Sequence, residues 1–278
     1  MKKLLFLPFF LFPLFAHAQV VCTKGDSAQV VKLVVEAPNT ADLYYFTKRF
    51  LGLPYVGHTL EVSDDKEPLV VNLRQLDCTT LIDTALGLYL TWKKKPKANM
   101  AFAVFKKELE SVRYFHGKRN GYVSRLHYFS QNWHDNVSRG NYHEVPIPES
   151  LTVPLTVNLH YMTQHPKAYR QLAAHPEYLP TIKAYEQKYS GRDGRYIPKN
   201  KLRLAEKYLK NGDIVAIVTK KDGLDYSHLG MVSFHTDGRV HLLNASSLKK
   251  KVVDDPQTLE AYLNGQQSAL GIRVWRTK

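Results

Sequence analysis

A cysteine at the start of a predicted helix is the first feature of this sequence that could carry chemistry. Residues 74–80 read Arg-Gln-Leu-Asp-Cys-Thr-Thr and lead directly into an apolar segment. Asp77 is positioned to cap a helix, which puts Cys78 in its first turn. The helix dipole and the free N–H groups there favour a thiolate, the nucleophilic form of cysteine. The alternative is an ordinary core cysteine, because free cysteine is among the most buried residue types.

A histidine later in the chain could serve as the base for this cysteine. His228 opens a predicted strand, and residues 236–238, Thr-Asp-Gly, can turn the chain into a second, antiparallel strand. In an even register Asn244 shares the face of His228, whereas in an odd register His241 is the alternative. A carboxamide or a second imidazole there could orient His228. Cysteine, then histidine, then an amide is the chain order of papain-type enzymes.

The elements that must position these residues begin with helices. Asn39 or Thr40 caps a predicted helix that runs to Leu51 and stops at Gly52, and extended pieces follow at 59–62 and 69–73. The segment after Cys78 is apolar on more than one helical face, which predicts a buried helix. Another helix is expected near 102–112, an extended piece at 151–159, and a helical stretch broken by prolines at 163–190.

The last third of the chain alternates in the manner of strands. We expect strands at 213–218, 228–234, 239–244 and 271–275. A short helix is predicted between the last two, with Asp255 as its cap, Pro256 at its first position and Gly265 at its end. Helices first and an antiparallel meander last predict an α+β fold in which the helix that carries Cys78 packs on the sheet.

Composition and charge narrow the classes of protein. The chain has 278 residues, of which 44% are hydrophobic, and this excludes a disordered or collagen-like chain. Two cysteines are too few for a disulfide scaffold or a four-cysteine zinc site. The formal charge of +14 suits an anionic polymer or a solvated basic surface. The basic residues are scattered without an interleaved aromatic face, so no nucleic-acid partner is expected.

The first 18 residues have the pattern of a secretory leader. A basic start is followed by an apolar stretch at 4–15, too short to span a bilayer, and by Ala-His-Ala at 16–18. Removal of residues 1–18 leaves one domain, 19–278, and a charge of +14 − 2 = +12. We expect export to the periplasm without stable membrane insertion. Lipid anchoring at Cys22 is the less favoured reading, because no small residue stands just before that cysteine.

Four segments resemble a known family. They are the Pro-Tyr segment at 52–57, the Cys segment at 76–80, the His strand at 227–231 and the Asn strand at 241–246. Together they resemble the NlpC-type cysteine peptidases, a papain-like superfamily of bacterial cell-wall enzymes. Residues 124–128, Ser-Arg-Leu-His-Tyr, are typical of its N-acetylmuramoyl-L-alanine amidase-like subfamily. The long gap between Cys78 and His228 implies a large helical insertion at 93–205, as that subfamily has.

The resemblance implies a catalytic assignment. Cys78 would attack an amide carbonyl, His228 would move the proton, Asn244 would orient His228, and Tyr55 with the Cys78 N–H would stabilise the oxyanion. It implies a papain-like core, no metal or cofactor, and hydrolysis of the bond between N-acetylmuramic acid and L-alanine. Small muropeptides, including those with an anhydro sugar end, are the implied substrates, and a monomer is expected.

The insertion is where substrate selection is expected. Its candidate substrate-binding residues are Arg125, which can pair with a carboxylate, and His127, Tyr128 and Tyr122, which can cover a sugar. Packing of a helix is the alternative explanation for these aromatics, and Trp133 is expected in the core.

Three other functions stay open. The same triad could cut between D-glutamate and the diamino acid, as an endopeptidase. A zinc amidase could use some of the many histidines, although no His-Glu-x-x-His motif is present. A wall-binding module without catalysis is the third alternative.

Overall fold

The computed structural model describes residues 20–278, so the predicted leader at 1–18 lies outside the described residues. The helices are α1 (Lys24–Val35), α2 (Leu43–Lys48), α3 (Cys78–Lys93), α4 (Ala98–Arg113), α5 (Phe129–Ser138), α6 (Tyr161–Gln164), α7 (Arg170–Ala174), α8 (Leu179–Tyr189), α9 (Leu202–Ala205) and α10 (Leu259–Asn264). The strands are β1 (Val20–Val21), β2 (Leu69–Val70), β3 (Tyr142–Glu144), β4 (Val153–Val157), β5 (Gly191–Pro198), β6 (Ile214–Thr219), β7 (Tyr226–Phe234), β8 (Val240–Ser246), β9 (Lys251–Thr258) and β10 (Ala269–Thr277).

One antiparallel sheet organises the molecule. Its strand order is β4-β5-β10-β6-β7-β8-β9, and β3 adds to β10 beside this path. The pairs β6–β7, β7–β8 and β8–β9 join neighbours in sequence, which is the predicted meander. Strands β1 and β2 form a separate parallel pair. Helices and an antiparallel sheet together confirm the mixed α and β architecture expected from the sequence.

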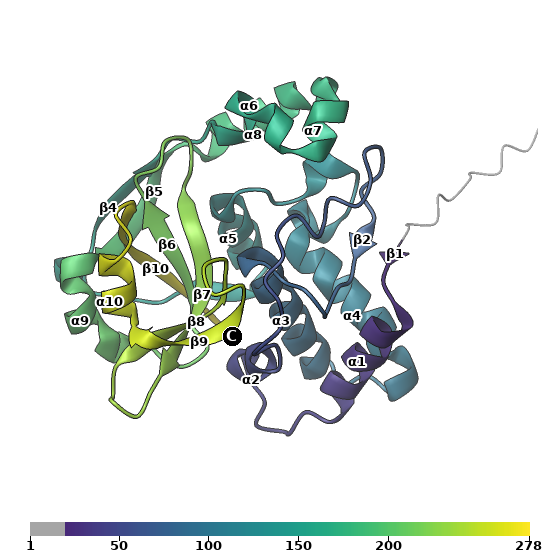
Figure 1. Ribbon diagram of the computed structural model, residues 1–278, viewed down its shortest axis with the longest axis horizontal. Coiled ribbons are helices and arrows are strands. Elements are labelled where there is room, and N and C mark those ends of the chain that lie inside the picture. Colours follow the sequence, from purple (N-terminus) through teal and green to yellow (C-terminus); the bar gives the residue numbers. More distant parts are fainter. Residues whose placement is uncertain (1–19) are drawn as a thin grey trace, which may run out of the picture.

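Helix α3 lies between the sheet and the other N-terminal helices. It contacts α1, α2 and α4 on one side and strands β7 and β8 on the other. Figure 1 shows α3 in the middle of the molecule, with the sheet to its left and α1 and α4 to its right. This position explains why its apolar residues are not confined to one stripe, because a helix surrounded by protein buries several faces. The prediction of a buried helix is confirmed.

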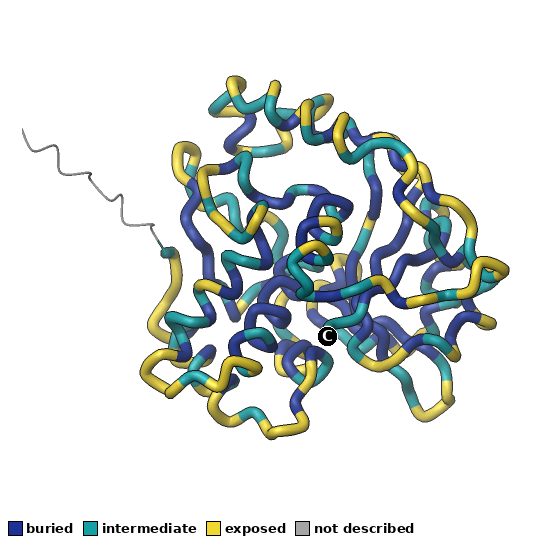
Figure 2. The backbone as a smooth tube through the Cα atoms, turned by 180° about the vertical axis from the view of Figure 1, so that it is seen from behind, coloured by how far each residue is buried: buried dark blue, intermediate teal, exposed yellow. Residues whose placement is uncertain are grey.

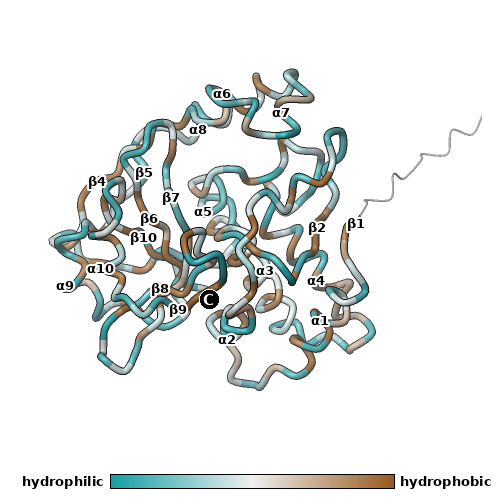
Figure 3. Tube along the Cα trace, in the orientation of Figure 1, coloured by the Kyte–Doolittle hydropathy of each residue, from teal (hydrophilic) through white to brown (hydrophobic). Residues whose placement is uncertain are grey.

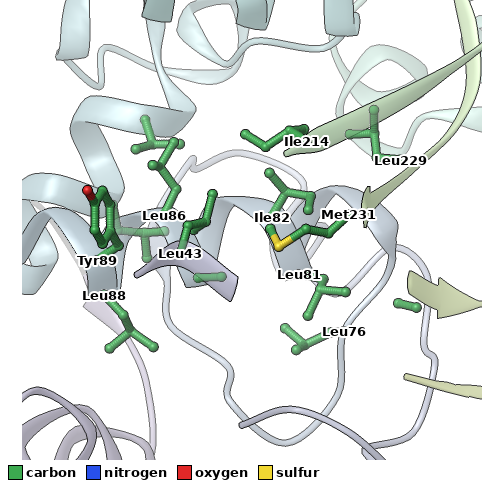
Figure 4. Packing of buried hydrophobic residues seen from close by; sticks show 14 of the residues in the cluster. Leu43, Leu76, Leu81, Ile82, Leu86, Leu88, Tyr89, Ile214, Leu229 and Met231 are labelled. Atoms are coloured by element: carbon green, nitrogen blue, oxygen red, sulfur yellow. The ribbon is translucent and has the colours of Figure 1, made fainter. Parts of the chain in front are cut away.

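The sheet separates two hydrophobic cores. Alternation along β6 sends Ile214, Ala216 and Val218 to the α3 side, and Val215 and Ile217 to the side covered by α9 and α10. In Figure 4, Leu81 and Ile82 of α3 lie against Met231 of β7.

Burial and hydropathy follow this layering. The buried segments gather along the junction of helix and sheet in Figure 2, while exposed segments lie at the edge. Figure 3 shows hydrophobic stretches in β6 and β10 and hydrophilic loops outside them. The start of α3 is therefore anchored in a core, which holds the first turn of that helix in a fixed position.

Two early predictions need correction. The predicted helix up to Leu51 is shorter, because Asp42 caps it through Tyr45 N at 2.7 Å and the helix ends at Lys48. Turn-type bonds continue to Leu51, and Gly52, at φ 85°, ends the segment as predicted. The expected extended piece at 59–62 is wrong, since the chain turns there, whereas β2 confirms the piece at 69–73.

A third correction concerns the last helix. Thr258, not Asp255, caps α10 by accepting a hydrogen bond from Ala261 N at 3.2 Å. Asp255 and Pro256 instead belong to β9, a strand the sequence analysis missed. Strand β9 lies at the edge of the sheet, where a proline costs no essential ladder bond. Strands β3 and β5 were missed as well.

Residues 93–205 are built into the fold. Helix α4 packs on α3, and β5 pairs with both β4 and β10 of the main sheet. The expected helix near 102–112 is α4, and the extended piece at 151–159 contains β4. The broken helical stretch at 163–190 overlaps the end of α6 and contains α7 and α8. Within residues 20–278, no helix has the length and hydropathy needed to cross a membrane.

Candidate active site

Cys78 is held at the first position of α3 by the helix cap before it. Asp77 Oδ1 accepts a hydrogen bond from Thr80 N at 2.8 Å, and Asp77 N donates to Thr80 Oγ1 at 2.9 Å, which forms a capping box. This confirms the predicted cap. Leu81, one turn into the helix, is fully buried. The turn that carries Cys78 is therefore held by the cap before it and by the core after it.

His228 comes to Cys78 from the start of β7. Ile217 pairs with His228, but the next residue, Val218, pairs with Tyr226, so Ser227 is an extra residue that forms a β-bulge. Bulges bend a strand and redirect the side chains beside it. The His228 side chain is half-buried and lies beside Cys78, with which it lines a common cleft.

Asn244 holds the other nitrogen of His228. The pairs Met231–Leu243 and Val232–Leu242 set an even register, so Asn244 shares the face of His228. Asn244 Oδ1 accepts from His228 Nε2 at 2.9 Å, and Asn244 Nδ2 donates to Leu242 O at 3.1 Å. The second bond fixes which end of the amide faces the histidine. Nδ1 is then the ring nitrogen that is left for Cys78.

His241 does not reach the imidazole of His228. It pairs with Ser233 in the same ladder and therefore points to the other face. Its ring bonds Asp255 O at 2.9 Å and Asp237 Oδ2 at 3.1 Å, and stacks on His235. Of the two orienting candidates, the register places only Asn244 against His228.

The pKa of His228 reflects these contacts. Burial alone would lower it, because a charged ring loses hydration. The adjacent Cys78 and the hydrogen bond to Asn244 together outweigh burial and raise the pKa above its usual value. The arrangement therefore favours a protonated imidazole beside the sulfur, which is the form that stabilises negative charge there.

Tyr55 is brought to the same place by main-chain pairing. Tyr55 N donates to Lys250 O at 2.9 Å, and a parallel bridge joins Tyr55 to Leu76, the residue directly before the helix cap Asp77. Burial, with the nearby Cys78 and Asp77, raises the pKa of the Tyr55 phenol. The hydroxyl thus stays protonated and can donate a hydrogen bond beside the sulfur.

Three clefts surround Cys78, His228 and Tyr55, and each takes its name from one residue that lines it. The Arg125 cleft has about 260 Å³ and is lined by Tyr55, Gly57, His58, Leu60, Glu61, Asp77, Cys78, Thr79, Arg125, Leu126, His127 and Tyr169. The Tyr128 cleft has about 200 Å³ and is lined by Cys78, Thr79, residues 127–129, Met162, Tyr169 and residues 224–229. The Lys221 cleft has about 160 Å³ and is lined by Ile217, Lys221, Ser227, His228, Ser247, Leu248, Tyr262, Gln266 and Ser268.

Arg125 lines its cleft, but its charge is already paired. It binds the Glu61 carboxylate, and its Nη1 lies 3.6 Å from Glu67 Oε1. Its guanidinium also lies 4.9 Å from the centre of the Tyr122 ring. One oxygen of Glu61 and the Nη1 atom of Arg125 are both buried and have no hydrogen-bond partner within the described residues. The cleft wall therefore contains a paired carboxylate and guanidinium rather than a free cation at Arg125.

His127 is a neutral member of the same wall. Burial and the charge of Arg125 hold the pKa of His127 well below its usual value, and its Nε2 lies 3.0 Å from Tyr122 O. With the proton on Nε2, Nδ1 is a hydrogen-bond acceptor. His127 lines both the Arg125 cleft and the Tyr128 cleft, at the point where they meet Cys78.

The two predicted tyrosines lie differently. Tyr128 lines its cleft, and its hydroxyl is held by Glu186 Oε1 at 2.7 Å and by Met162 N at 2.9 Å. Tyr122 is only 1% exposed and packs behind His127, with ring centres 4.4 Å apart. Tyr122 thus has a supporting position behind the wall, not the ligand-facing position that the sequence analysis predicts.

Sequence reasoning missed several residues of these walls. Glu61, Tyr169 and Lys221 line clefts but stand in segments without a motif, 17 residues or more from Cys78 in the sequence. Glu61 is joined to Arg125 across 64 positions of sequence. The two carboxylates of the Arg125 cleft, Asp77 and Glu61, are both engaged, one by the helix cap and one by Arg125.

Another cavity lies away from Cys78. It has about 360 Å³ and is lined by His116, His134, Asp135, Ser138, residues 188–190, Arg192 and Asp193. Both of its serine hydroxyls donate to main-chain carbonyls, and His134 is bonded to Asp193 at 3.1 Å. Within residues 20–278, no three Asp, Glu, His or Cys side chains are grouped as metal ligands. The smaller clefts around Cys78 are the better candidate site on chemical grounds.

Comparisons with known proteins agree on one family. A family model described as AmiA-like, N-acetylmuramoyl-L-alanine amidase-like, matches residues 45–272. A structure described as an N-acetylmuramoyl-L-alanine amidase from Bacteroides uniformis ATCC 8492 is 37% identical, with a TM-score of 0.78 over 90% of this chain and 99% of that chain. A second crystal structure with the same description is 38% identical over 85% of this chain and 99% of that chain, with a TM-score of 0.78.

Other comparisons add less about function. A Bacteroides fragilis structure described as "a putative xylanase" is 37% identical over 84% of this chain and 99% of that chain, with a TM-score of 0.76. A protein from Legionella pneumophila str. Philadelphia 1 is 21% identical with a TM-score of 0.71, over 91% of this chain and 94% of that chain, and shows the fold alone. No match was found among curated proteins.

Proposed function

Because the chain belongs to the N-acetylmuramoyl-L-alanine amidase-like family, we propose that it is a cysteine-dependent amidase. Its substrates would be peptidoglycan fragments, cut between N-acetylmuramic acid and L-alanine. The observation that carries the thiol mechanism is the position of the His228 imidazole, which lies beside Cys78 and is bonded through Nε2 to Asn244. A base in contact with a nucleophile and an orienting amide is the arrangement that acyl transfer needs.

The first half of the proposed reaction forms a thioester. The Cys78 sulfur attacks the muramoyl amide carbonyl, and its proton passes to His228 Nδ1. The carbonyl oxygen becomes an oxyanion, which accepts hydrogen bonds from the Tyr55 hydroxyl and the Cys78 N–H. His228 then gives its proton to the alanine nitrogen, the C–N bond breaks, and the peptide leaves with a free amine.

The second half releases the sugar. Water enters where the amine left and gives a proton to His228 as it attacks the thioester carbonyl. The C–S bond breaks, the sulfur recovers the proton from His228, and muramic acid leaves with a free carboxyl group. Every proton passes through one ring, so the orientation of that ring by Asn244 serves both halves.

The finer family and cellular assignments are part of the same proposal. A nucleophile at a helix start, followed in the chain by strands that supply histidine and asparagine, supports a papain-like core of the NlpC type with 93–205 as its insertion. The sequence of residues 1–18 supports export to the periplasm, with Cys22 free rather than lipidated. Residues 19–278 would then be one catalytic domain.

Mass spectrometry of muropeptide digests tests the proposal. Purified residues 19–278 should release intact free peptide and intact disaccharide, and Cys78→Ala should release neither. Cys22→Ser is the matched control, because Cys22 is exposed and outside the clefts. Activity should persist with a chelator present. Recovery of sugar that still carries a dipeptide would instead establish the endopeptidase, and binding without turnover would establish the wall-binding module.

A further inference from the structure

The Lys221 cleft opens on the side of His228 that faces α10. The imidazole of His228 and the ring of Tyr262 lie nearly parallel, with centres 6.5 Å apart, and both line this cleft. Strands β6 and β7 supply Ile217 and Ser227, and α10 supplies Tyr262. In Figure 1 these three elements lie together on the left of the molecule. Cys78 does not line this cleft, so it extends away from the sulfur beyond the histidine.

Unused hydrogen-bonding groups surround the cleft. Within residues 20–278, Lys221, Gln266 and Ser268 make their protein hydrogen bonds through main-chain atoms only. The side chains of Ser227 and Ser247 likewise have no protein partner among these residues, and both residues are exposed. Five polar side chains around one small cleft are thus free to bind a polar ligand.

Charge distinguishes this cleft from the Arg125 cleft. Lys221 is its one permanently charged lining residue, no acid lines it, and the adjacent Asp222 is engaged by His160 at 3.0 Å. The Arg125 cleft contains Glu61 and Asp77, and its arginine is already paired. An anionic part of a substrate therefore fits the Lys221 side, and a neutral, hydroxyl-bearing part fits the Arg125 side.

The proton transfers of the proposed reaction require the same orientation of the substrate. In the proposed reaction His228 must reach the leaving nitrogen, while Tyr55 must reach the carbonyl oxygen. Tyr55 lines the Arg125 cleft, whereas His228 lines both the Lys221 cleft and the Tyr128 cleft. Of the two clefts at His228, the Lys221 cleft is lined by a lysine and the Tyr128 cleft by Asp225, so a peptide carboxylate fits the Lys221 cleft. The acyl half of the substrate therefore extends past Tyr55, and the amine half extends past His228.

We propose that the Lys221 cleft binds the peptide half of the substrate and that Lys221 pairs with a carboxylate of that peptide. This inference rests on the proposed function, in which the amine product is a peptide with free carboxylates and the acyl product is a sugar acid. The ion pair is made equally in the ground state and the transition state, so it contributes to KM and not to kcat.

A pair of substrates tests the inference. N-acetylmuramoyl-L-alanyl-D-glutamate is compared with its diamide, in which both carboxylates are neutral carboxamides. Wild type should have the lower KM for the dicarboxylate. Lys221→Met should raise that KM about five- to tenfold, leave its kcat unchanged, and leave the diamide unaffected. Lys220→Met, an exposed neighbour that does not line the cleft, is the matched control and should behave as wild type.

A binding measurement separates this inference from the proposed function. The dipeptide L-alanyl-D-glutamate is titrated into Cys78→Ala and into Cys78→Ala with Lys221→Met. Weaker binding in the second protein supports the peptide site even if wild type cuts another bond. Equal binding in both proteins, or an equal rise in KM for dicarboxylate and diamide, overturns the role of Lys221. Failure of wild type to cleave either muramoyl substrate counts against the proposed function alone.

Discussion

Replacing Asn244 by alanine is the sharpest test of how the imidazole of His228 is held. The substitution removes the acceptor 2.9 Å from His228 Nε2 and leaves that N–H buried without a partner, since Asn244 itself has no exposed surface. The same amide is anchored to Leu242 O and does not contact the Cys78 sulfur directly. The change therefore acts on the histidine and not on the Cys78 sulfur.

The size of the effect follows from the charge on the ring. A hydrogen bond to a charged group is worth about 1.5–3 kcal/mol and a neutral one about 0.5–1.5 kcal/mol. The loss thus penalises the imidazolium by about 1–1.5 kcal/mol more than the neutral ring, which corresponds to about tenfold in kcat/KM. It should also lower the pKa of His228, because the hydrogen bond to Asn244 is one of the contacts that raise it.

Two assays report these consequences separately. Muropeptide hydrolysis across a pH series should show kcat/KM reduced at its maximum, with KM nearly unchanged. The pH range over which Cys78 is rapidly alkylated in the absence of substrate should narrow, because the imidazolium that supports the thiolate is lost at lower pH. Both assays use the Cys22→Ser background, so that the exposed second thiol does not react.

His241→Gln is the control on the same strand. His241 is buried but faces Asp237 and Asp255 O, so its replacement should leave kcat/KM within about twofold while thermal unfolding reports any loss of stability. The reasoning is refuted if Asn244→Ala keeps wild-type kcat/KM and alkylation behaviour, or if His241→Gln reproduces its loss.

Three further changes have definite expected outcomes. Tyr55→Phe should lower kcat by about 10²–10³ with KM unchanged, since it removes the proposed oxyanion donor, and an equal kcat in steady-state assays would contradict that role. Asp77→Ala should reduce stability in urea by about 1 kcal/mol through loss of the bond to Thr80 N, while Asp77→Asn should not. The lowered pKa of His127 means that its contribution to stability is full above the usual 6.5 and is lost as pH falls below it. Below pH 6.5 the unfolding free energy of the wild type should fall as the pH falls, and His127→Gln should reduce that slope by up to about 1.4 kcal/mol per pH unit. An unchanged slope in the variant would count against this account.

Local signals were sufficient to predict the placement of the central residues. The cap at Asp77 places Cys78, and the turn before β8 sets a register that brings Asn244 to His228. These signals are short-range in sequence, and their physical cause is the same in any chain. The catalytic roles of these residues stay predictions until the substitutions are measured.

Other parts of the site depend on contacts between distant segments. The pairing of Arg125 with Glu61 joins positions far apart in sequence, and no pattern marks Glu61 as the partner. Asp255 and Pro256 resemble the start of a helix, but main-chain pairing with β8 draws them into an edge strand. The sequence predicts Tyr122 as a ligand-facing residue, because aromatic residues occur both in hydrophobic cores and in sugar-binding sites.

The extra residue at Ser227 shifts the alternation of side chains along strand β7 by one position. Alternation without it would put Tyr226 on the face of His228. With it, the Tyr226 hydroxyl reaches Arg273 at 3.0 Å on the α3 side while His228 meets Asn244 on the other side. Deleting this one residue would force a choice between the two faces: either the histidine keeps its partners or the buried tyrosine does. Because the two side chains lie on opposite faces of the sheet, a substitution in the packing around Tyr226 can leave the contact between His228 and Asn244 unchanged.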